Sequence, residues 1–181
     1  SDWWNEQSVS WHGFYMTRDD EDENSDDVIG THFTFPNYPF RASGHWVRTG
    51  DNFNPALGFV RRRGGESTGL GFTYYFEQPE NELLEDISVG AEYDRYEWLD
   101  GDLDSDELEI NLIGIRTLSG DFLGLEVEFE RDILQEPFEI IDEVIIPSSE
   151  YKGIDFELEF RSSSNRPVFG EFEIAYGHFY G

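Results

Sequence analysis

The chain has 181 residues, with 12 Lys and Arg against 40 Asp and Glu, which gives a formal net charge of −28. This charge excludes a nucleic-acid binder, whose phosphate contacts need a cationic face. Aromatic residues make up 17% of the chain, too many for a disordered acidic tail, because such tails lack the apolar surface that offsets the entropy of ordering. We therefore expect one folded domain over residues 1–181.

Two features that the sequence lacks exclude certain kinds of site and of membrane segment. There is no cysteine, which excludes disulfides, thiolate nucleophiles and Cys-based zinc sites. There is also no apolar run of about 18 residues, so a membrane-spanning helix is not expected.

Alternation of apolar and polar residues predicts strands along the whole chain. In chain order the expected strands are 9–17, 28–35, 40–48, 68–76, 87–98, 108–116, 123–129, 154–161 and 172–176. The alternation is strictest at 154–161, where I-D-F-E-L-E-F-R separates apolar residues from charged ones on opposite faces. A helix would not separate them in this way.

Turn residues fall between these segments at hairpin spacing, at Pro36-Asn37, Asp100-Gly101, Ser119-Gly120 and 162–167. The predicted fold class is all-β, an antiparallel meander of about nine long strands. Three segments interrupt the pattern. We expect an acidic solvated loop at 18–27, a proline-flanked structured loop or irregular edge strand at 136–151, and, at 80–85, the only helix candidate, too short to matter.

A sheet with one apolar and one acidic face fits two settings, a soluble sandwich or a membrane barrel. Strands of eight to twelve residues exceed the usual soluble length of about five to six and approach what a tilted strand needs to cross a bilayer. Aromatic residues cluster near strand ends, and glycine recurs inside strands, as in a sheet that bends. These features favour a sheet curved or closed as an outer-membrane-type β-barrel over a sandwich.

Residues 50–62 read G-D-N-F-N-P-A-L-G-F-V-R-R, which resembles the G-D-D-F-N-P-E-V-G-F-V-x-R signature of the bacterial outer-membrane domain-of-unknown-function 5916 family. Within 136–151, E-P-F-E-I and V-I-I-P-S-S-E-Y are similar to the family's P-F-E-I-x-x-G-V-x-I-P-P-G-x-Y segment. The closing G-H-F-Y-G resembles its last strand. Departures occur at Asp142-Glu143, where the family has Gly, and at Ser148-Ser149, where Pro-Gly is usual.

The resemblance covers most of the chain and implies the C-terminal β-barrel part of a protein whose earlier part is a carbohydrate-binding-like module. The chain would then be a C-terminal fragment, located in the bacterial outer membrane or at the extracellular surface. The family has no established catalytic residues, so none is transferred. Unpaired strand edges would need a neighbour, and we expect identical copies to provide it, as a homo-oligomer through strand edges.

Acidic residues suggest two kinds of site. Carboxylates at alternate positions of one turn could hold calcium, at Asp100, Asp102, Asp104 and Asp106, although the spacing excludes an EF-hand and a solvated acidic turn is the alternative. A polar strand face is predicted at Glu126, Glu128, Glu157, Glu159, Glu171 and Glu173. No other cofactor is expected.

Other chemistry-bearing residues do not form motifs. His12, His32, His45 and His178 lie in separate strands, and no nucleophile motif is present, so we expect no enzyme activity. The 61–63 arginines more simply pair with neighbouring carboxylates than bind an anion. The tryptophans could stack on sugar rings, but interface anchoring or packing explains them equally well; they are Trp3, Trp4, Trp11, Trp46 and Trp98.

Three functions remain open at this stage. The first is a non-enzymatic outer-membrane barrel module with lipid outside and an acidic, cation-favouring inner face of unknown cargo. The second is a structural protein that assembles by strand-edge pairing into an extracellular oligomer or filament. The third and weakest is a soluble carbohydrate-binding sheet, whose binding the change Trp46→Ala would abolish.

Overall fold

The computed structural model describes residues 8–18, 26–53, 63–78, 80–141 and 144–177. Its strands are β1 (Ser10–Arg18), β2 (Asp26–Phe35), β3 (Phe40–Thr49), β4 (Gly65–Glu77), β5 (Leu84–Trp98), β6 (Leu103–Thr117), β7 (Phe122–Ile133), β8 (Phe138–Ile141), β9 (Val144–Ile146), β10 (Glu150–Arg161) and β11 (Glu171–Tyr176). No helix occurs among the described residues.

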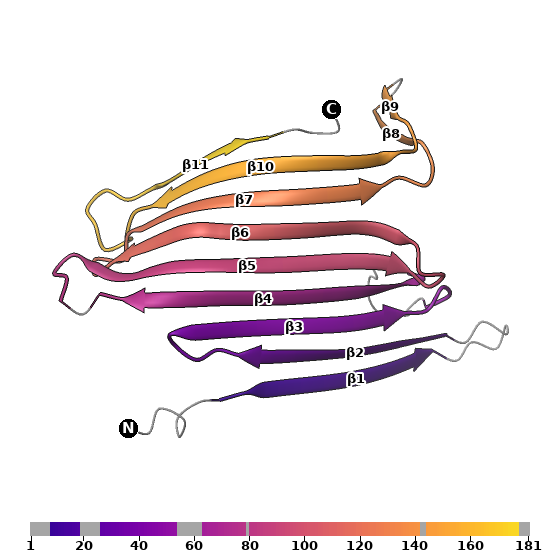
Figure 1. The fold of residues 1–181 in the computed structure, drawn as a ribbon, viewed down its shortest axis with the longest axis horizontal. Helices are drawn as coiled ribbons and strands as arrows, with labels where there is room; N and C mark the ends of the chain where they lie inside the picture. The colour runs from indigo at the N-terminus through magenta and orange to yellow at the C-terminus, as the bar shows by residue number, and fades with distance from the viewer. Residues whose placement is uncertain (1–7, 19–25, 54–62, 79, 142–143, 178–181) are drawn as a thin grey trace.

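Nine strands form one antiparallel sheet in the order β1-β2-β3-β4-β5-β6-β7-β10-β11, while β8 and β9 pair with each other separately. Every neighbour in the large sheet except β7 and β10 is also the next strand along the chain. Figure 1 shows these strands side by side in a single layer. The predicted antiparallel meander of nine strands is therefore confirmed.

The sheet is open in the described residues, since β1 and β11 are its two ends in the strand order. The closure expected of a barrel is therefore not seen in these strands. The predicted turns are found between β2 and β3, β5 and β6, β6 and β7, and β10 and β11. Gly101 and Gly120 have φ values of 92° and 88°, which L-residues with side chains rarely adopt.

The three segments that interrupt the alternation differ in structure. Within 136–151, β8 and β9 form a two-stranded sheet and β10 already begins. In the acidic segment 18–27, Arg18 ends β1 and Asp26 begins β2, with 19–25 outside the described residues. The candidate at 80–85, set aside as too short to matter, is not a helix: it is turn and bend up to Leu83, and β5 then begins.

Cross-strand register gathers most of the apolar side chains on one face, which we call the apolar belt, although Phe14 and Met16 of β1 lie on the other face. Phe156, for example, pairs with Val127, which pairs with Ile110, which pairs with Ala91. The exposed members of the belt are Trp11, Tyr15, Ile29, Phe33, Phe40, Leu70, Phe72, Phe76, Ile113, Leu123, Phe129, Ile154, Phe156, Leu158, Phe160, Phe172, Ile174 and Tyr176.

The sheet has almost no core of its own. Among the described residues, the only buried hydrophobic side chains are Val28, Phe53, Val127 and Ile146. A sheet buries its apolar face against a second layer or against another apolar phase. Here the described residues supply no second layer over the belt.

Candidate functional site: the polar face of the sheet

The polar face carries carboxylates directly opposite one another across four strands. One row runs from Asp94 on β5 through Glu107 on β6 to Glu130 on β7. The next row runs from Glu92 through Glu109 and Glu128 to Asp155. Like charges in facing positions repel each other, so this arrangement destabilises the sheet unless cations or water-filled space screen it.

The structure places the predicted polar-face residues together on this side of the sheet. Glu126 faces Glu157, Glu128 faces Asp155, and Glu159 faces Glu173. Glu171 faces Arg161 at the end of β10, one pair beyond the others on the same face. The six residues thus extend the carboxylate rows across β7, β10 and β11.

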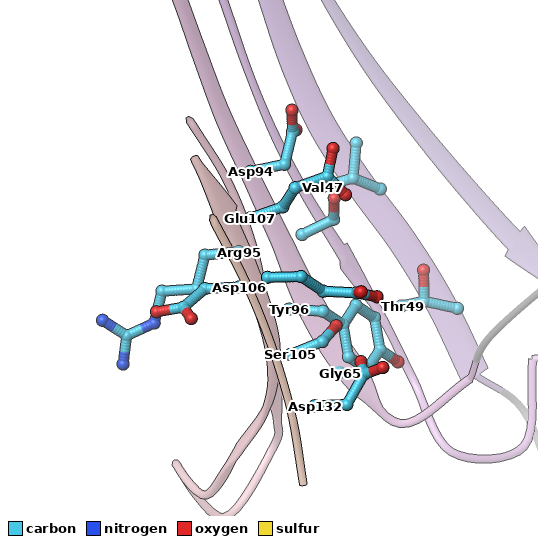
Figure 2. Close-up of a pocket in the computed structure, with 12 residues that line it drawn as sticks. Val47, Thr49, Gly65, Asp94, Arg95, Tyr96, Ser105, Asp106, Glu107 and Asp132 are labelled. Carbon is cyan, nitrogen blue, oxygen red and sulfur yellow. The ribbon is translucent and has the colours of Figure 1, made fainter. Parts of the chain in front are cut away.

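A hollow of about 550 Å³ lies on the polar face where β3 to β7 approach one end. On the polar face its acidic side chains are Asp94, Glu107, Glu130 and Asp132, together with hydroxyl groups. Figure 2 shows Asp94 and Glu107 pointing to one side of the sheet, whereas Arg95 and Asp106 point to the other. The carboxylates and hydroxyl groups of the hollow attract cations or water, while Val47 and Tyr96 give it a partly apolar lining.

Three histidines form a row that the sequence did not reveal. His12 faces His32, and His32 faces His45, across β1, β2 and β3. His45 Nε2 lies 3.7 Å from Asp94 Oδ1, and Gly69 between them leaves the space that both side chains occupy. Spacing along the chain could not show this row, because strand register alone brings the three positions together.

The candidate calcium residues lie in the turn between β5 and β6 and at the start of β6. Asp100 Oδ1 accepts a hydrogen bond of 3.1 Å from the Asp102 amide, which closes the turn. Asp106 is bound to Arg131 through two hydrogen bonds and lies on the belt side. Among the described residues, no three His, Asp or Glu side chains form a group that could hold a metal ion. Calcium binding here remains a prediction.

A second polar cluster ties two connections together at the opposite end of the sheet. Asp121, before β7, accepts hydrogen bonds from the Ser163 amide at 2.9 Å and from Arg166 Nε at 2.8 Å. Ser119 Oγ donates a third at 2.9 Å. The Arg166 bonds, then the Ser163 amide, hold the pKa of Asp121 well below its usual range.

The tryptophans do not form one platform. Trp11 and Trp46 lie on the belt side, on strands separated by β2, whereas Trp98 lies at the end of β5 on the other side. Trp3, Trp4 and His178 lie outside the described residues, as do the first two arginines of 61–63. The three described tryptophans therefore form no common platform for a sugar.

No stretch of helix in the described part of the chain is long and apolar enough to span a membrane. Comparison of the chain with protein-family models, with curated proteins and with solved structures finds no match.

Proposed function

We propose that these nine strands form part of the wall of a membrane β-barrel without enzymatic activity. The apolar belt faces lipid, and the polar face lines a water-filled interior that favours cations. The resemblance of residues 50–62 to an outer-membrane family supports the bacterial outer membrane as the location.

The observation that carries this proposal is that side chains of the apolar belt are exposed, whereas those of the polar face are half-buried. Along β10, Ile154, Phe156, Leu158 and Phe160 are exposed, whereas the intervening Asp155, Glu157 and Glu159 are half-buried. On β4, Leu70, Phe72 and Phe76 are likewise exposed, and Thr73 and Tyr75 are half-buried. A water-soluble sheet shows the opposite pattern, because its apolar face is the buried one.

The extent of the belt also argues for an apolar surrounding. It crosses the large sheet from Trp11 on β1 to Tyr176 on β11. Soluble monomers rarely expose contiguous apolar patches larger than a few hundred Å², and larger ones mark membrane or protein contacts. Lipid covers such a surface on every strand at once, which a small partner cannot do.

The connections at the two ends of the sheet differ in length. Those at one end span 19–25, 50–64, 99–102 and 134–149, and those at the other span 36–39, 78–83, 118–121 and 162–170. Outer-membrane barrels have short periplasmic turns and longer extracellular loops. We therefore assign the end with 50–64 and 134–149, which we call the long-loop end, to the outside.

Ion selectivity in planar bilayers tests the proposal. The purified chain, refolded in detergent and added to the bilayer, is expected to conduct K⁺ in preference to Cl⁻, measured as a reversal potential under a KCl gradient. The double variant Glu126→Gln/Glu157→Gln removes two facing carboxylates and should lower that preference. A matched control, Glu80→Gln/Glu82→Gln in the connection before β5, should leave it unchanged.

Two results would count against the proposal. One is a chain that stays in solution without detergent as a monomer. The other is a conducting chain whose preference for K⁺ is the same in both double variants.

A second candidate, self-assembly into an extracellular oligomer or filament, is favoured by the two open edges. Every residue of β11 is exposed, and β1 and β11 each have a strand on one side only. Unpaired edges of this kind bind another strand. Ordered assemblies seen by electron microscopy in buffer without detergent would favour this candidate over the barrel.

A further inference from the structure

The apolar belt ends at one border in a row of cations. On four adjacent strands the belt's last side chains are Tyr93, Leu108, Phe129 and Ile154, which face one another in register. Two residues further along each strand, toward the long-loop end, the same face presents Arg95, Asp106, Arg131 and Lys152, again in register. We call these four residues the border row; it has three cations and one carboxylate.

The opposite border of the belt has no such row. On the same four strands, the residues at that end are Leu84, which faces Thr117, and then Asp121 and Ser162, just outside β7 and β10. The nearby guanidinium of Arg166 is bound to Asp121. In a chain with net charge −28, three cations thus lie together at one border of the belt, with Asp106, Glu97 and Glu150 beside them.

The cations of the border row keep donors for a further ligand. Arg131 uses Nε and Nη2 on Asp106, and a guanidinium has five N–H groups. Arg95 is bound to Glu97, and Lys152 lies 2.9 Å from Glu150, both carboxylates being one step further from the belt. The side chains of Arg95, Arg131 and Lys152 are 39%, 37% and 67% exposed.

We propose that Arg95, Arg131 and Lys152 bind the phosphates of anionic lipid headgroups at the long-loop border of the belt. This inference rests on the proposed function, because it requires lipid against the belt. Cations at the edge of an apolar surface meet the headgroup layer, and a guanidinium matches a phosphate in geometry and charge. Each cation near an anionic membrane surface is worth about 1 kcal/mol, or roughly fivefold in binding.

Brominated lipids test the inference. The chain is reconstituted into vesicles of mixed phosphatidylcholine and phosphatidylglycerol, and one lipid or the other is brominated, so that quenching of tryptophan fluorescence reports the lipid beside the belt. Trp46 faces Thr68, which faces Arg95, and so reports on the border row itself. To isolate it, the other four tryptophans are replaced by Phe. The parent should prefer phosphatidylglycerol by at least about fivefold.

The triple variant Arg95→Gln/Arg131→Gln/Lys152→Gln should bring the preference close to one. A control removes three other cations away from the row, by Arg41→Gln/Arg116→Gln/Arg161→Gln, and should keep the parent preference. Inorganic phosphate, compared with chloride at equal ionic strength, should not compete; competition would show a site for free phosphate and overturn the inference.

The outcomes separate the two proposals. Quenching by neither brominated lipid would overturn the barrel itself, and this inference with it. Equal quenching by the two lipids in the parent, or an equal loss of preference in the triple variant and the control, would overturn the border row alone and leave the barrel standing.

Discussion

Arginine placed along β10 measures whether the apolar belt faces lipid. Ile154, Phe156, Leu158 and Phe160 project from one face of this strand and are 47%, 47%, 37% and 43% exposed. If that surface were in water, replacing any of them by arginine would change the free energy of unfolding by no more than about 0.5 kcal/mol. If it is in lipid, the cost depends on depth in the bilayer.

The expected profile follows from the geometry of the strand. At about 3.4 Å per residue and a strand tilt of about 40°, the Cα atoms from Ile154 to Phe160 cover about 16 Å of the roughly 25 Å apolar band of a membrane barrel. Arginine costs about 2–4 kcal/mol at the midplane and about 0–1 kcal/mol near the interfaces. Phe156→Arg and Leu158→Arg should therefore destabilise by about 2–4 kcal/mol, and the two outer variants by less, between the midplane and the interface costs.

The assay is urea titration of the protein refolded in phosphatidylcholine vesicles, followed by tryptophan fluorescence. Asp155→Arg and Glu157→Arg serve as controls on the same strand, since their side chains lie on the polar face opposite other carboxylates. There an arginine relieves repulsion and should cost nothing. A flat profile along the belt, or equal costs on the two faces, would refute the assignment of the belt to lipid.

Three further predictions concern the ends and the middle of the sheet. Arg166 lowers the pKa of Asp121, so at acid pH the folded state binds fewer protons than the unfolded state. The stabilisation from this carboxylate should therefore be complete above the ordinary carboxyl range and should fall as the pH drops below about 4. In unfolding measurements at pH 7 and pH 3, Asp121→Asn should be less stable than the parent at pH 7 and should lose this pH dependence. Since the chain lacks cysteine, a membrane-impermeant maleimide on intact cells should label Asp102→Cys, between β5 and β6, and spare Ser119→Cys, between β6 and β7; the reverse would invert the orientation. A Cβ on Gly90 would lie 2.7 Å from the backbone carbonyl oxygen of Phe72, which cannot move aside, so Gly90→Ala should destabilise by about 1–3 kcal/mol. Gly13→Ala, with 3.8 Å of clearance, should change the free energy of unfolding little.

The sequence predicts the strands well because side-chain alternation is a local signal. The segments expected at 154–161 and 172–176 lie within β10 and β11, and each of the other seven expected segments corresponds to one strand of the large sheet. Alternation does not show which strands pair when the partners are far apart in the chain. Strands β8 and β9 form a small separate sheet, while β10 pairs with β7, and no alternation within 136–151 could indicate that choice.

The sequence predicts the residues of the polar face only where acidic residues alternate along a single strand. Glu126 and Glu128 are found by their spacing, but the row from Asp94 to Glu130 depends on register between strands. Bulges within the β5–β6 and β6–β7 pairs shift that register, at Ser88/Gly90 and Asn111/Ile113. Each one-residue slip moves a side chain to the other face, so pairing cannot be counted from turn lengths alone.

The direction of the two edge strands constrains how such a wall can close. In an antiparallel meander of nine strands, the first and the ninth run the same way, as β1 and β11 do in Figure 1. If these two edges met, they would pair in parallel, whereas an odd number of additional strands between them would keep every pair antiparallel. Bacterial single-chain outer-membrane barrels have even strand numbers. A barrel of that kind containing these nine strands therefore needs an odd number of strands beyond the nine, whichever residues provide them.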